Sequence, residues 1–530
     1  MNQLRSNKNA YLYRRAFLKA AGHGCAALAV YRLPDLAAST AQAQGGWAGP
    51  VTPTTIPSDI LHTSARNLAR LIREKKVSSV EVVSAYLKQI ERVNPPLNAV
   101  VLVCAERALR EAREADAALQ KKDLKGPLHG VPFTIEDSFD TAGVVSTGGT
   151  LGRKNYMPSR DATVVARLRQ AGAILLGKTN VGELSLSDQT DNLIFRRTFN
   201  PYDLQRSPGG SSGGAAAIIA AGGSPLDIGS DIAGGIRGPA HFCGIAALKP
   251  TVALVPRTGH VIDYGGICDP YQQIGPMARW AEDLSLVLPL IIGPDYSDAG
   301  IAPVPLVRSE EMDLTNLKLA FYTDNGTEPK PTAQTVEAVT TAVQLLGAAG
   351  LPANEDCPKD LFTEAEEIRA KYDGADDRAW VRRLLDKHKT KSASPSLPLG
   401  GKVVTSAEFT HLAERLDGCR SKLLQWLVKY DVVLCPAFAH PAPAYREEPS
   451  GPPIYPKDYG YTGISNLTGW PAAVVRAGGS PDGLPIAVQV VGRPWREDVV
   501  LAVAQLIESR TGGWKPPAYT KGRFMGGEPV

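Results

Sequence analysis

Several features that mark large classes of proteins are scarce in this 530-residue sequence. Seven cysteines and eight histidines are scattered without CxxC or HExxH spacing, so we expect no metal site and no other cofactor. The net charge is only +4 and the basic residues are interspersed with acids, whereas a nucleic-acid partner needs a concentrated basic patch. Beyond the N-terminal region no uninterrupted apolar run approaches the roughly 20 residues that span a bilayer, so we expect no stable membrane insertion.

The N-terminal region has its own pattern. The stretch "YRRAFLKAAGHGCAALAV" pairs Arg14 and Arg15 ahead of a modest apolar run, and a small-residue site follows at Ala41-Gln42-Ala43. This arrangement is similar to a twin-arginine export signal. We therefore predict a signal peptide over residues 1–43 and a periplasmic mature protein. The alternative is an amphipathic basic N-terminus with no export role.

The rest of the chain has the composition and periodicity of an ordinary globular protein. Hydrophobic residues make up 43% and charged residues 21%. Helical apolar spacing alternates with short apolar runs, as in "ATVVARLRQAGAILLGKTN", which is typical of an α/β sheet. Residues 309–401 are charged and helical in pattern, and we expect them to form a helical layer or a lid. Residues 511–530 are expected to be a C-terminal tail.

Two glycine-rich stretches lie close together in the sequence, "SPGGSSGGAAA" and "GSDIAGGIRGPAHFCG". With them the chain resembles the amidase signature family, and "GVPFTIEDSFDTAG", "GAILLGKTNVGELS" and "IGPMARWAEDLSLVL" follow the same family order. The resemblance covers residues 60–510. It implies one large α/β domain with a central mixed twisted β-sheet covered by helices. It also implies a small-molecule substrate and hydrolysis by a Ser-cis-Ser-Lys triad. Whether the protein forms a homodimer is left open.

The resemblance breaks down at both ends of that triad. The bridging cis-serine matches Ser211, with Ser212 beside it, but Glu136 stands where the family has its lysine. Gly235 stands where the family has its nucleophilic serine, and the spacing fits without a gap. Glycine has no side chain with which to attack a carbonyl, and a glutamate inverts the charge of the usual base. Lys178 matches a different family position and is interpreted as a structural lysine at a strand end.

Other parts of the family site are retained. The backbone of Ile232, Ala233, Gly234 and Gly235 corresponds to the segment whose N–H groups form the family's oxyanion hole, and Asp231 keeps its family position. His260 lies in a tract that departs from the family and is expected to border the pocket, with a surface loop as the alternative. The candidate catalytic residues are thus Glu136, Ser211 and Ser212, and the candidate substrate-binding residues are Asp231, Ile232, Ala233, Gly234, Gly235 and His260.

Two functional hypotheses follow. In the first, an enzyme acts on a small carbonyl compound such as an amide or ester, with Glu136 as a buried acid or base and no serine acyl-enzyme. Its reaction is hydrolysis by direct attack of water, elimination, or isomerisation next to the carbonyl, so the enzyme is a hydrolase, a lyase or an isomerase. In the second, the protein is noncatalytic and binds a ligand or partner, and Glu136 is only a hydrogen-bonded carboxylate. A solvent-open cavity that contains Glu136 favours catalysis, whereas a collapsed pocket favours the second hypothesis. Tyr459, Tyr461 and Trp470 are candidates for the pocket wall, with core packing as the alternative.

Overall fold

The computed structural model describes residues 60–518 except 263, 265, 268, 270 and 446–457. The predicted signal peptide, residues 1–43, lies outside the described residues, as does most of the predicted C-terminal tail. The described residues belong to one compact unit, Ile56–Val530.

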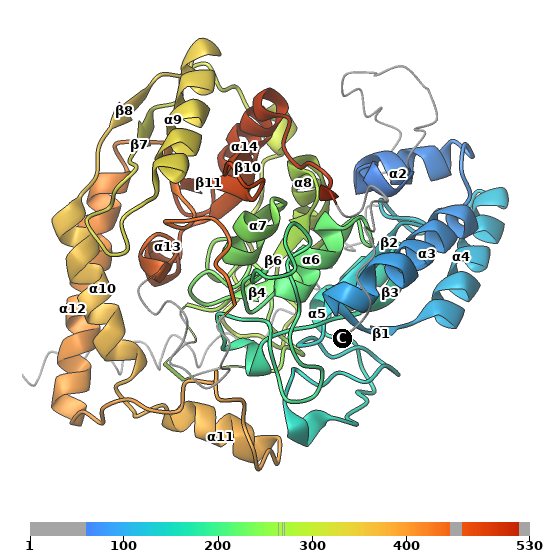
Figure 1. The fold of residues 1–530 in the computed structure, drawn as a ribbon, viewed down its shortest axis with the longest axis horizontal. Helices are drawn as coiled ribbons and strands as arrows, with labels where there is room; N and C mark the ends of the chain where they lie inside the picture. Colours follow the sequence, from blue (N-terminus) through green and yellow to red (C-terminus); the bar gives the residue numbers. More distant parts are fainter. Residues whose placement is uncertain are drawn as a thin grey trace, which may run out of the picture. The chain divides into compact units, whose positions relative to one another are not determined.

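Two β-sheets run through this unit (Figure 1). The small sheet has the order β1-β3-β2 and the large sheet has the order β4-β6-β5-β10-β11-β9-β7-β8. Both sheets are mixed. In the small sheet β3 runs antiparallel to β1 and parallel to β2. In the large sheet the pairs from β4 to β9 are antiparallel, whereas β7 runs parallel to both β9 and β8. The strands are β1 Val100–Val103, β2 Pro132–Glu136, β3 Ile174–Thr179, β4 Leu226–Asp231, β5 Ala246–Lys249, β6 Gln273–Ala278, β7 Leu319–Phe321, β8 Ala353–Glu355, β9 Val432–Pro436, β10 Ala472–Gly479 and β11 Pro485–Gly492.

The large sheet is buried on both faces, as its nearly continuous apolar strands require. Successive side chains of a strand point to opposite faces. In β10, Ala473 and Val475 join the core that holds α8, α9 and α14, whereas Val474 joins the core that holds α6 and α7. The two groups of helices therefore cover opposite faces. This confirms the expected α/β domain with a central mixed sheet covered by helices.

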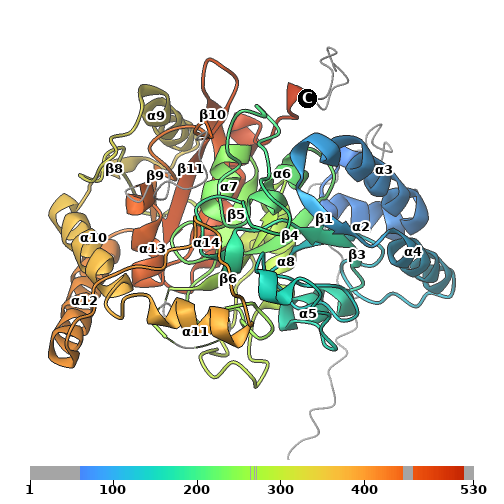
Figure 2. The same ribbon diagram turned by 60° about the horizontal axis from the view of Figure 1, so that its bottom comes forward.

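The helices surround both sheets (Figure 2). No helix in the described ranges is long and apolar enough to cross a membrane. The α-helices are α2 Ala65–Arg73, α3 Ser79–Leu97, α4 Ala105–Gln120, α5 Thr163–Gln170, α6 Gly213–Ala220, α7 Arg237–Cys243, α8 Ala281–Ile291, α9 Ala333–Ala348, α10 Lys359–Asp373, α11 Ala379–Lys387, α12 Ser406–Leu427, α13 Gly463–Thr468 and α14 Glu497–Thr511, and the short 3-10 helices are η1 Ile60–His62, η2 Leu151–Arg153, η3 Glu183–Ser185, η4 Ser309–Glu311 and η5 Asp458–Gly460.

The segment 309–401 is not a purely helical layer. It supplies α9, α10 and α11, but it also contributes β7 and β8, the last two strands at one end of the large sheet. Each of these strands has only three residues, too few to show a period of two in the sequence. In both ribbon views α10 and α12 lie side by side, on the side of the unit away from β1 to β3 (Figures 1 and 2).

The two sheets meet where β2 lies beside β4. The hydroxyl of Thr134 on β2 donates a 2.6 Å hydrogen bond to Asp227 on β4, and the hydroxyl of Thr179 on β3 donates to the same carboxylate oxygen at 3.1 Å. The junction brings the ends of β2 and β4, which carry Glu136 and Asp231, into one part of the fold.

Candidate active site

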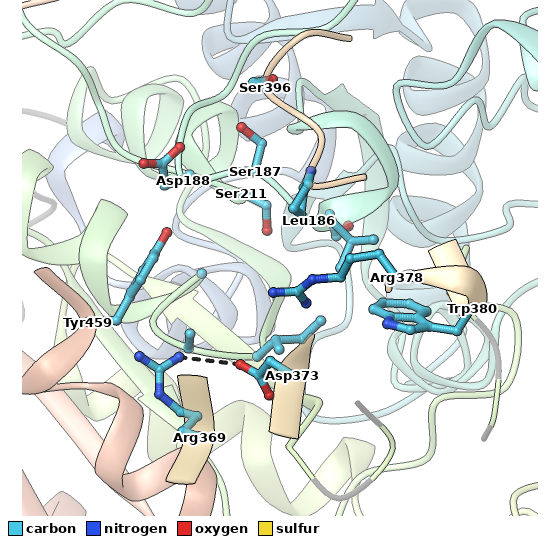
Figure 3. A pocket seen from close by; sticks show the side chains of 16 residues that line it. Leu186, Ser187, Asp188, Ser211, Arg369, Asp373, Arg378, Trp380, Ser396 and Tyr459 are labelled. Atoms are coloured by element: carbon cyan, nitrogen blue, oxygen red, sulfur yellow. Dashed lines mark ion pairs between the residues drawn. The ribbon is translucent and has the colours of Figure 1, made fainter. Parts of the chain in front are cut away.

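A cavity of about 210 Å³ lies next to the glycine-rich loops (Figure 3). Its wall combines the loop after β3, the loop before α6, the loop after β4 and the helical segment around α10 and α11. The lining residues are Ser185, Leu186, Ser187, Asp188, Gly210, Ser211, Ile232, Ala233, Gly235, Arg369, Asp373, Arg378, Trp380, Ser396, Pro398 and Tyr459.

Ser211 and Gly235 are neighbours on this wall. The peptide bond between Gly210 and Ser211 is cis, as the resemblance implied. A Cβ added at Gly235 would lie 3.0 Å from Ser211 Oγ and 2.6 Å from the carbonyl oxygen of Ser230. A side chain at position 235 would therefore point at Ser211, but it would need the backbone at Ser230 to move. Ser212 lies behind the wall, fully buried, and its N–H donates to the Gly235 carbonyl at 3.1 Å.

The turn after β4 presents backbone donors to the cavity. Among the described residues, the N–H groups of Ala233, Gly234 and Gly235 have no protein acceptor. Gly234 has a φ of +140°, a region that side chains disfavour. Ile232, Ala233 and Gly235 line the cavity. The turn can therefore stabilise an oxygen that gains negative charge, which is the role of an oxyanion hole.

Asp231 anchors this turn from behind. Its carboxylate pairs with Arg237 through two 2.9 Å contacts and accepts from the Asn466 amide at 2.9 Å. Burial alone would raise the pKa of Asp231, but the Arg237 guanidinium and these hydrogen bonds outweigh it and lower the pKa. Asp231 is fully buried and does not line the cavity, so the structure places it as a support of the turn.

Glu136 ends β2 and is also fully buried. Its Oε1 accepts from Ser138 Oγ at 2.6 Å and from Ser185 Oγ at 3.1 Å. Its Oε2 and the Oγ of Ser212 are buried, and neither makes a well-formed hydrogen bond in the described part of the chain. Burial raises the pKa of Glu136 to about 7, although the nearby hydroxyls, Ser212 included, favour the ionised form. Glu136 can therefore gain or lose a proton near neutral pH.

Ser185 connects Glu136 to the cavity, because it lines the wall and donates to the carboxylate behind it. Leu184 and Ser185 both have positive φ values, 54° and 57°. The left-handed region costs non-glycine residues roughly 1–2 kcal/mol each, so the surrounding fold must stabilise this turn. The sequence analysis missed Ser185, since nothing in "ELSLS" shows which serine faces the strand end.

A second carboxyl lies close to Glu136. Burial, together with the negative charge of Glu136, raises the pKa of Asp227 to about 7, against hydrogen bonds from Thr134, Thr179 and Ile228. Lys178 does not pair with either acid in the described structure, because its Nζ donates to Thr141 Oγ1 at 3.0 Å and to the Phe139 carbonyl. That position agrees with a structural lysine at a strand end.

Comparison with known proteins identifies the family to which this geometry belongs. A family model described as Amidase matches residues 81–501. The chain belongs to the amidase family. This confirms the resemblance seen in the sequence.

Relatives of this amidase-family chain include enzymes with different substrates. It is 34% identical over 486 residues to a subunit of the glutamyl-tRNA(Gln) amidotransferase from Carboxydothermus hydrogenoformans, covering 86% of this chain and 98% of the relative. It is 33% identical over 501 residues to human fatty-acid amide hydrolase 2, covering 88% and 92%. Among solved structures, a 6-aminohexanoate cyclic dimer hydrolase complexed with substrate superposes with a TM-score of 0.77 at 26% identity, covering 87% of this chain and 99% of that one. The family is thus one of enzymes that act on amides.

Only one of the other residues that the sequence suggested for the pocket of this amidase-family protein lines the cavity. His260 forms a backbone bridge with Phe139 and packs edge-on against its ring at 5.0 Å. Burial lowers the pKa of His260 to about 3, and the residue does not line the cavity. Tyr459 does line it, whereas Tyr461 and Trp470 pack in a hydrophobic core.

The sequence analysis also missed one side of the cavity. Arg369, Asp373, Arg378 and Trp380 come from α10, α11 and their connection, a segment from which the sequence analysis named no site residue. No cluster of three or more histidine, cysteine, aspartate or glutamate side chains able to hold a metal is found within the described ranges.

Proposed function

We propose that this protein hydrolyses a small amide or ester by direct attack of water, with Glu136 as the acid and base and without a serine acyl-enzyme. The family resemblance assigns the lysine position to Glu136 and the nucleophile position to Gly235. Family membership supports action on an amide. The cavity has a volume of about 210 Å³, which supports a small substrate.

The observation that carries the proposal is the contact from Glu136 through Ser185 to the cavity. Glu136 itself does not line the wall, so it needs a hydroxyl to pass the proton. Ser185 Oγ lies 3.1 Å from Glu136 Oε1 and is part of the wall. A general base is most effective when its pKa is near the working pH, and the pKa of Glu136 is about 7.

The proposed step balances in atoms and charge. A water molecule beside Gly235 forms a bond to the carbonyl carbon, and its proton passes through Ser185 to Glu136. The carbonyl oxygen becomes an oxyanion that the N–H groups of Ala233, Gly234 and Gly235 stabilise. When the tetrahedral intermediate collapses, the C–N or C–O bond breaks and the leaving group takes the proton back from Glu136. The products are a carboxylic acid and an amine or alcohol.

The direct test replaces Glu136 by glutamine, which retains the volume but cannot titrate. We expect kcat/KM for small amides and esters to fall roughly 10²–10⁴-fold, the usual contribution of a positioned acid or base. Glu497→Gln is the control, because Glu497 is a buried glutamate that accepts a 2.6 Å hydrogen bond from Thr251 away from the cavity. Activity of Glu136→Gln within a few-fold of wild type contradicts the proposal. Binding of such compounds without any turnover favours the noncatalytic alternative.

A fluorophosphonate probe tests the absence of an acyl-enzyme. Gly235 offers no oxygen, so we expect no adduct at this position. Labelling of Ser211 or Ser212, together with turnover that is lost in the corresponding alanine variant, would replace the water mechanism by a displaced serine nucleophile.

We also propose that the protein is exported to the periplasm by the twin-arginine route, on the strength of Arg14, Arg15 and the small-residue site at Ala41-Gln42-Ala43. Replacing both arginines by lysine should leave the protein in the cytoplasm, as measured by cell fractionation. Unchanged periplasmic delivery of this double variant would overturn the proposal.

A further inference from the structure

The turn that positions Ser185 is in contact with the chain that follows α11. Glu183, the first residue of this turn, is fully buried, and its Oε2 accepts a 2.5 Å hydrogen bond from the N–H of Ser394. Its Oε1 accepts from the hydroxyl of Thr150 at 2.8 Å. Glu183 therefore joins the turn to a residue 211 positions further along the chain.

A second polar contact connects the same two parts of the fold. We call residues 388–398, which follow α11, the α11 loop. Thr390 of this loop has its Oγ1 2.7 Å from Thr150 Oγ1, and it accepts from the Gly152 N–H at 3.1 Å. Because the Thr150 hydroxyl donates to Glu183, Thr390 supplies the proton of the bond between the two threonines. A continuous chain of hydrogen bonds thus leads from the α11 loop to the turn.

Leu184, the middle residue of the turn, adds an apolar contact. It belongs to a hydrophobic cluster that includes the α11 and α11-loop residues Trp380, Val381, Leu384, Leu385 and Leu397. Two backbone hydrogen bonds of 2.8 Å also hold the turn, from the Leu184 N–H to Gly148 and from the Ser185 N–H to Gly182, but neither reaches α11 or the α11 loop. The side chains of Glu183 and Leu184 therefore connect the turn to that part of the fold.

The α11 loop also forms part of the cavity wall. Ser396 and Pro398 line the cavity, as does Trp380 near the start of α11 (Figure 3). On its other side the loop contacts the turn whose Ser185 hydroxyl donates to Glu136 at 3.1 Å. One segment is therefore placed between a substrate in the cavity and the residues of the proposed proton transfer.

The turn needs such support because its backbone conformation is unfavourable. Leu184 and Ser185 both have positive φ, and such conformations persist only where the surrounding structure holds them. A turn that relaxes would move the Ser185 hydroxyl away from Glu136. A misplacement of about 1 Å can lower the rate of an enzyme by roughly 100-fold.

We infer that Glu183 is a positioning residue, whose hydrogen bond to Ser394 allows the α11 loop to hold the Ser185 hydroxyl against Glu136. This inference rests on the proposed function, in which Ser185 passes the proton between water and Glu136. It adds a residue that contacts neither the substrate nor the reacting atoms but on which the proton transfer depends.

The experiment follows the Glu136 carboxyl by NMR in protein labelled with ¹³C-glutamate, and turnover with p-nitroacetanilide and p-nitrophenyl acetate. In Glu183→Ala we expect the titration midpoint of Glu136 to rise by about 0.5–1 pH unit, as in Ser185→Ala, because both variants remove the Ser185 hydrogen bond. The value of kcat should fall by roughly 10–100-fold. The double variant should show no further shift of the midpoint, because both changes act through one contact.

Two further variants separate position from charge. Glu183→Gln removes the charge, but its amide oxygen can accept from Ser394 and its NH₂ group can donate to the Thr150 hydroxyl. It should therefore keep the Glu136 midpoint and bring kcat back to within a few-fold of the wild-type value. Thr390→Val acts from the α11 loop, since it keeps the shape of the side chain but removes the hydroxyl, and it should raise the midpoint by less than Glu183→Ala does.

Glu497→Ala is the matched control, because Glu497 is also a buried glutamate that accepts a hydrogen bond from a distant backbone N–H, that of Thr251. It should change neither the Glu136 midpoint nor kcat. The same change in Glu497→Ala as in Glu183→Ala, or a Glu183→Gln variant that behaves like Glu183→Ala, would overturn the inference.

Further outcomes distinguish the inference from the proposed function. If Glu183→Ala does not fold, Thr390→Val decides, and an unchanged Glu136 midpoint and kcat in that variant would overturn the inference. Additive midpoint shifts in the double variant of Glu183 and Ser185 would also overturn it. Turnover that Glu183→Ala leaves intact would overturn the inference and leave the proposed function standing. The expected shifts of the Glu136 midpoint without turnover of either compound would support the inferred contact and count against the proposed function.

Discussion

The ends of β4 and β2 carry two carboxyl groups that are equally buried but whose pKa values are shifted in opposite directions. Asp231 on β4 has a guanidinium partner in Arg237, and that partner holds its pKa below the ordinary value despite burial. Glu136 on β2 has only hydroxyl partners, and burial raises its pKa to about 7. Burial is the same at both positions, so a direct ion pair decides which acid stays ionised. Lys178 forms no ion pair with Glu136 in the described part of the structure, and its charge lowers the pKa of Glu136 less than the neighbouring hydroxyls do.

This difference in pKa gives the two residues different roles: Asp231 supports the structure of the site, and Glu136 is suited to proton transfer. A permanently ionised Asp231 can fix the turn of Ala233, Gly234 and Gly235 but cannot exchange protons near neutral pH. A titrating Glu136 can exchange protons, but it has no ion-pair partner among the described residues, so its ionised form lowers stability. Neighbouring acids whose surroundings push their pKa values apart are a recurring arrangement in enzymes with acid and base roles.

Removing the cation at Asp231 should have the largest effect. Arg237→Met keeps apolar bulk but leaves Asp231 buried without its partner. We expect a loss of about 3–5 kcal/mol in the free energy of unfolding, measured by denaturant titration at neutral pH. Arg383→Met, on an exposed side chain, serves as the control. A loss below about 1 kcal/mol for Arg237→Met would show that the pair does not hold Asp231 ionised.

Removing the charge at Glu136 should have the opposite effect on stability and increase the free energy of unfolding at neutral pH. The folded-state pKa of Glu136 is raised, so its contribution to stability is fully present at acid pH and is lost as the pH rises towards about 7. Relative to wild type, Glu136→Gln should gain about 2 kcal/mol in unfolding free energy between about pH 5.5 and 8. Denaturant titrations of both proteins across this range measure the gain. A difference that does not change with pH would mean that Glu136 does not titrate in this range and would contradict the raised pKa.

The smallest predicted effect is a change in the pKa of Glu136 when the hydroxyl of Ser185 is removed. Its hydroxyl favours the ionised form of Glu136, so Ser185→Ala should raise the pKa of Glu136. We expect the titration midpoint of the Glu136 carboxyl, followed by NMR, to move upward by about 0.5–1 pH unit. The value of kcat/KM should also fall, because Ser185 passes the proton from water to Glu136 in the proposed mechanism. Ser187→Ala is the control, because Ser187 also lines the cavity but accepts from the Gln189 N–H instead. A downward shift, or the same shift in both variants, would remove Ser185 from the contact to Glu136.

Positions set by strand ends and glycine-rich turns could be predicted from the sequence. Glu136 follows a short apolar run and lies at the end of β2, and Ser211 and Gly235 are neighbours as the family spacing implied. The position of Glu136 depends on local periodicity, which the sequence shows directly. The closeness of Ser211 and Gly235 was implied by the family resemblance.

The remaining parts depend on contacts between distant segments. The side chain of Ser185 reaches Glu136 only because two successive residues adopt positive φ, which no periodicity indicates. Arg378 and Trp380 belong to the segment 309–401, from which no site residue was expected, and the fold brings them to the cavity although they lie far along the chain from the oxyanion turn. His260 was expected at the pocket border, but its contact with Phe139 draws it into the interior.

The most direct test of the central claim compares the titration of Glu136 with the pH dependence of the reaction. The carboxyl carbon of Glu136 can be followed by NMR in protein labelled with ¹³C-glutamate, and its signal is assigned by its absence in Glu136→Gln. We predict that Glu136 titrates at about 7. We also predict that kcat/KM rises with the same midpoint, because the base must be ionised to accept a proton, and that this rise is lost in Glu136→Gln. A Glu136 that titrates near the ordinary range for glutamate, or a rate profile that keeps its midpoint in Glu136→Gln, would contradict the account.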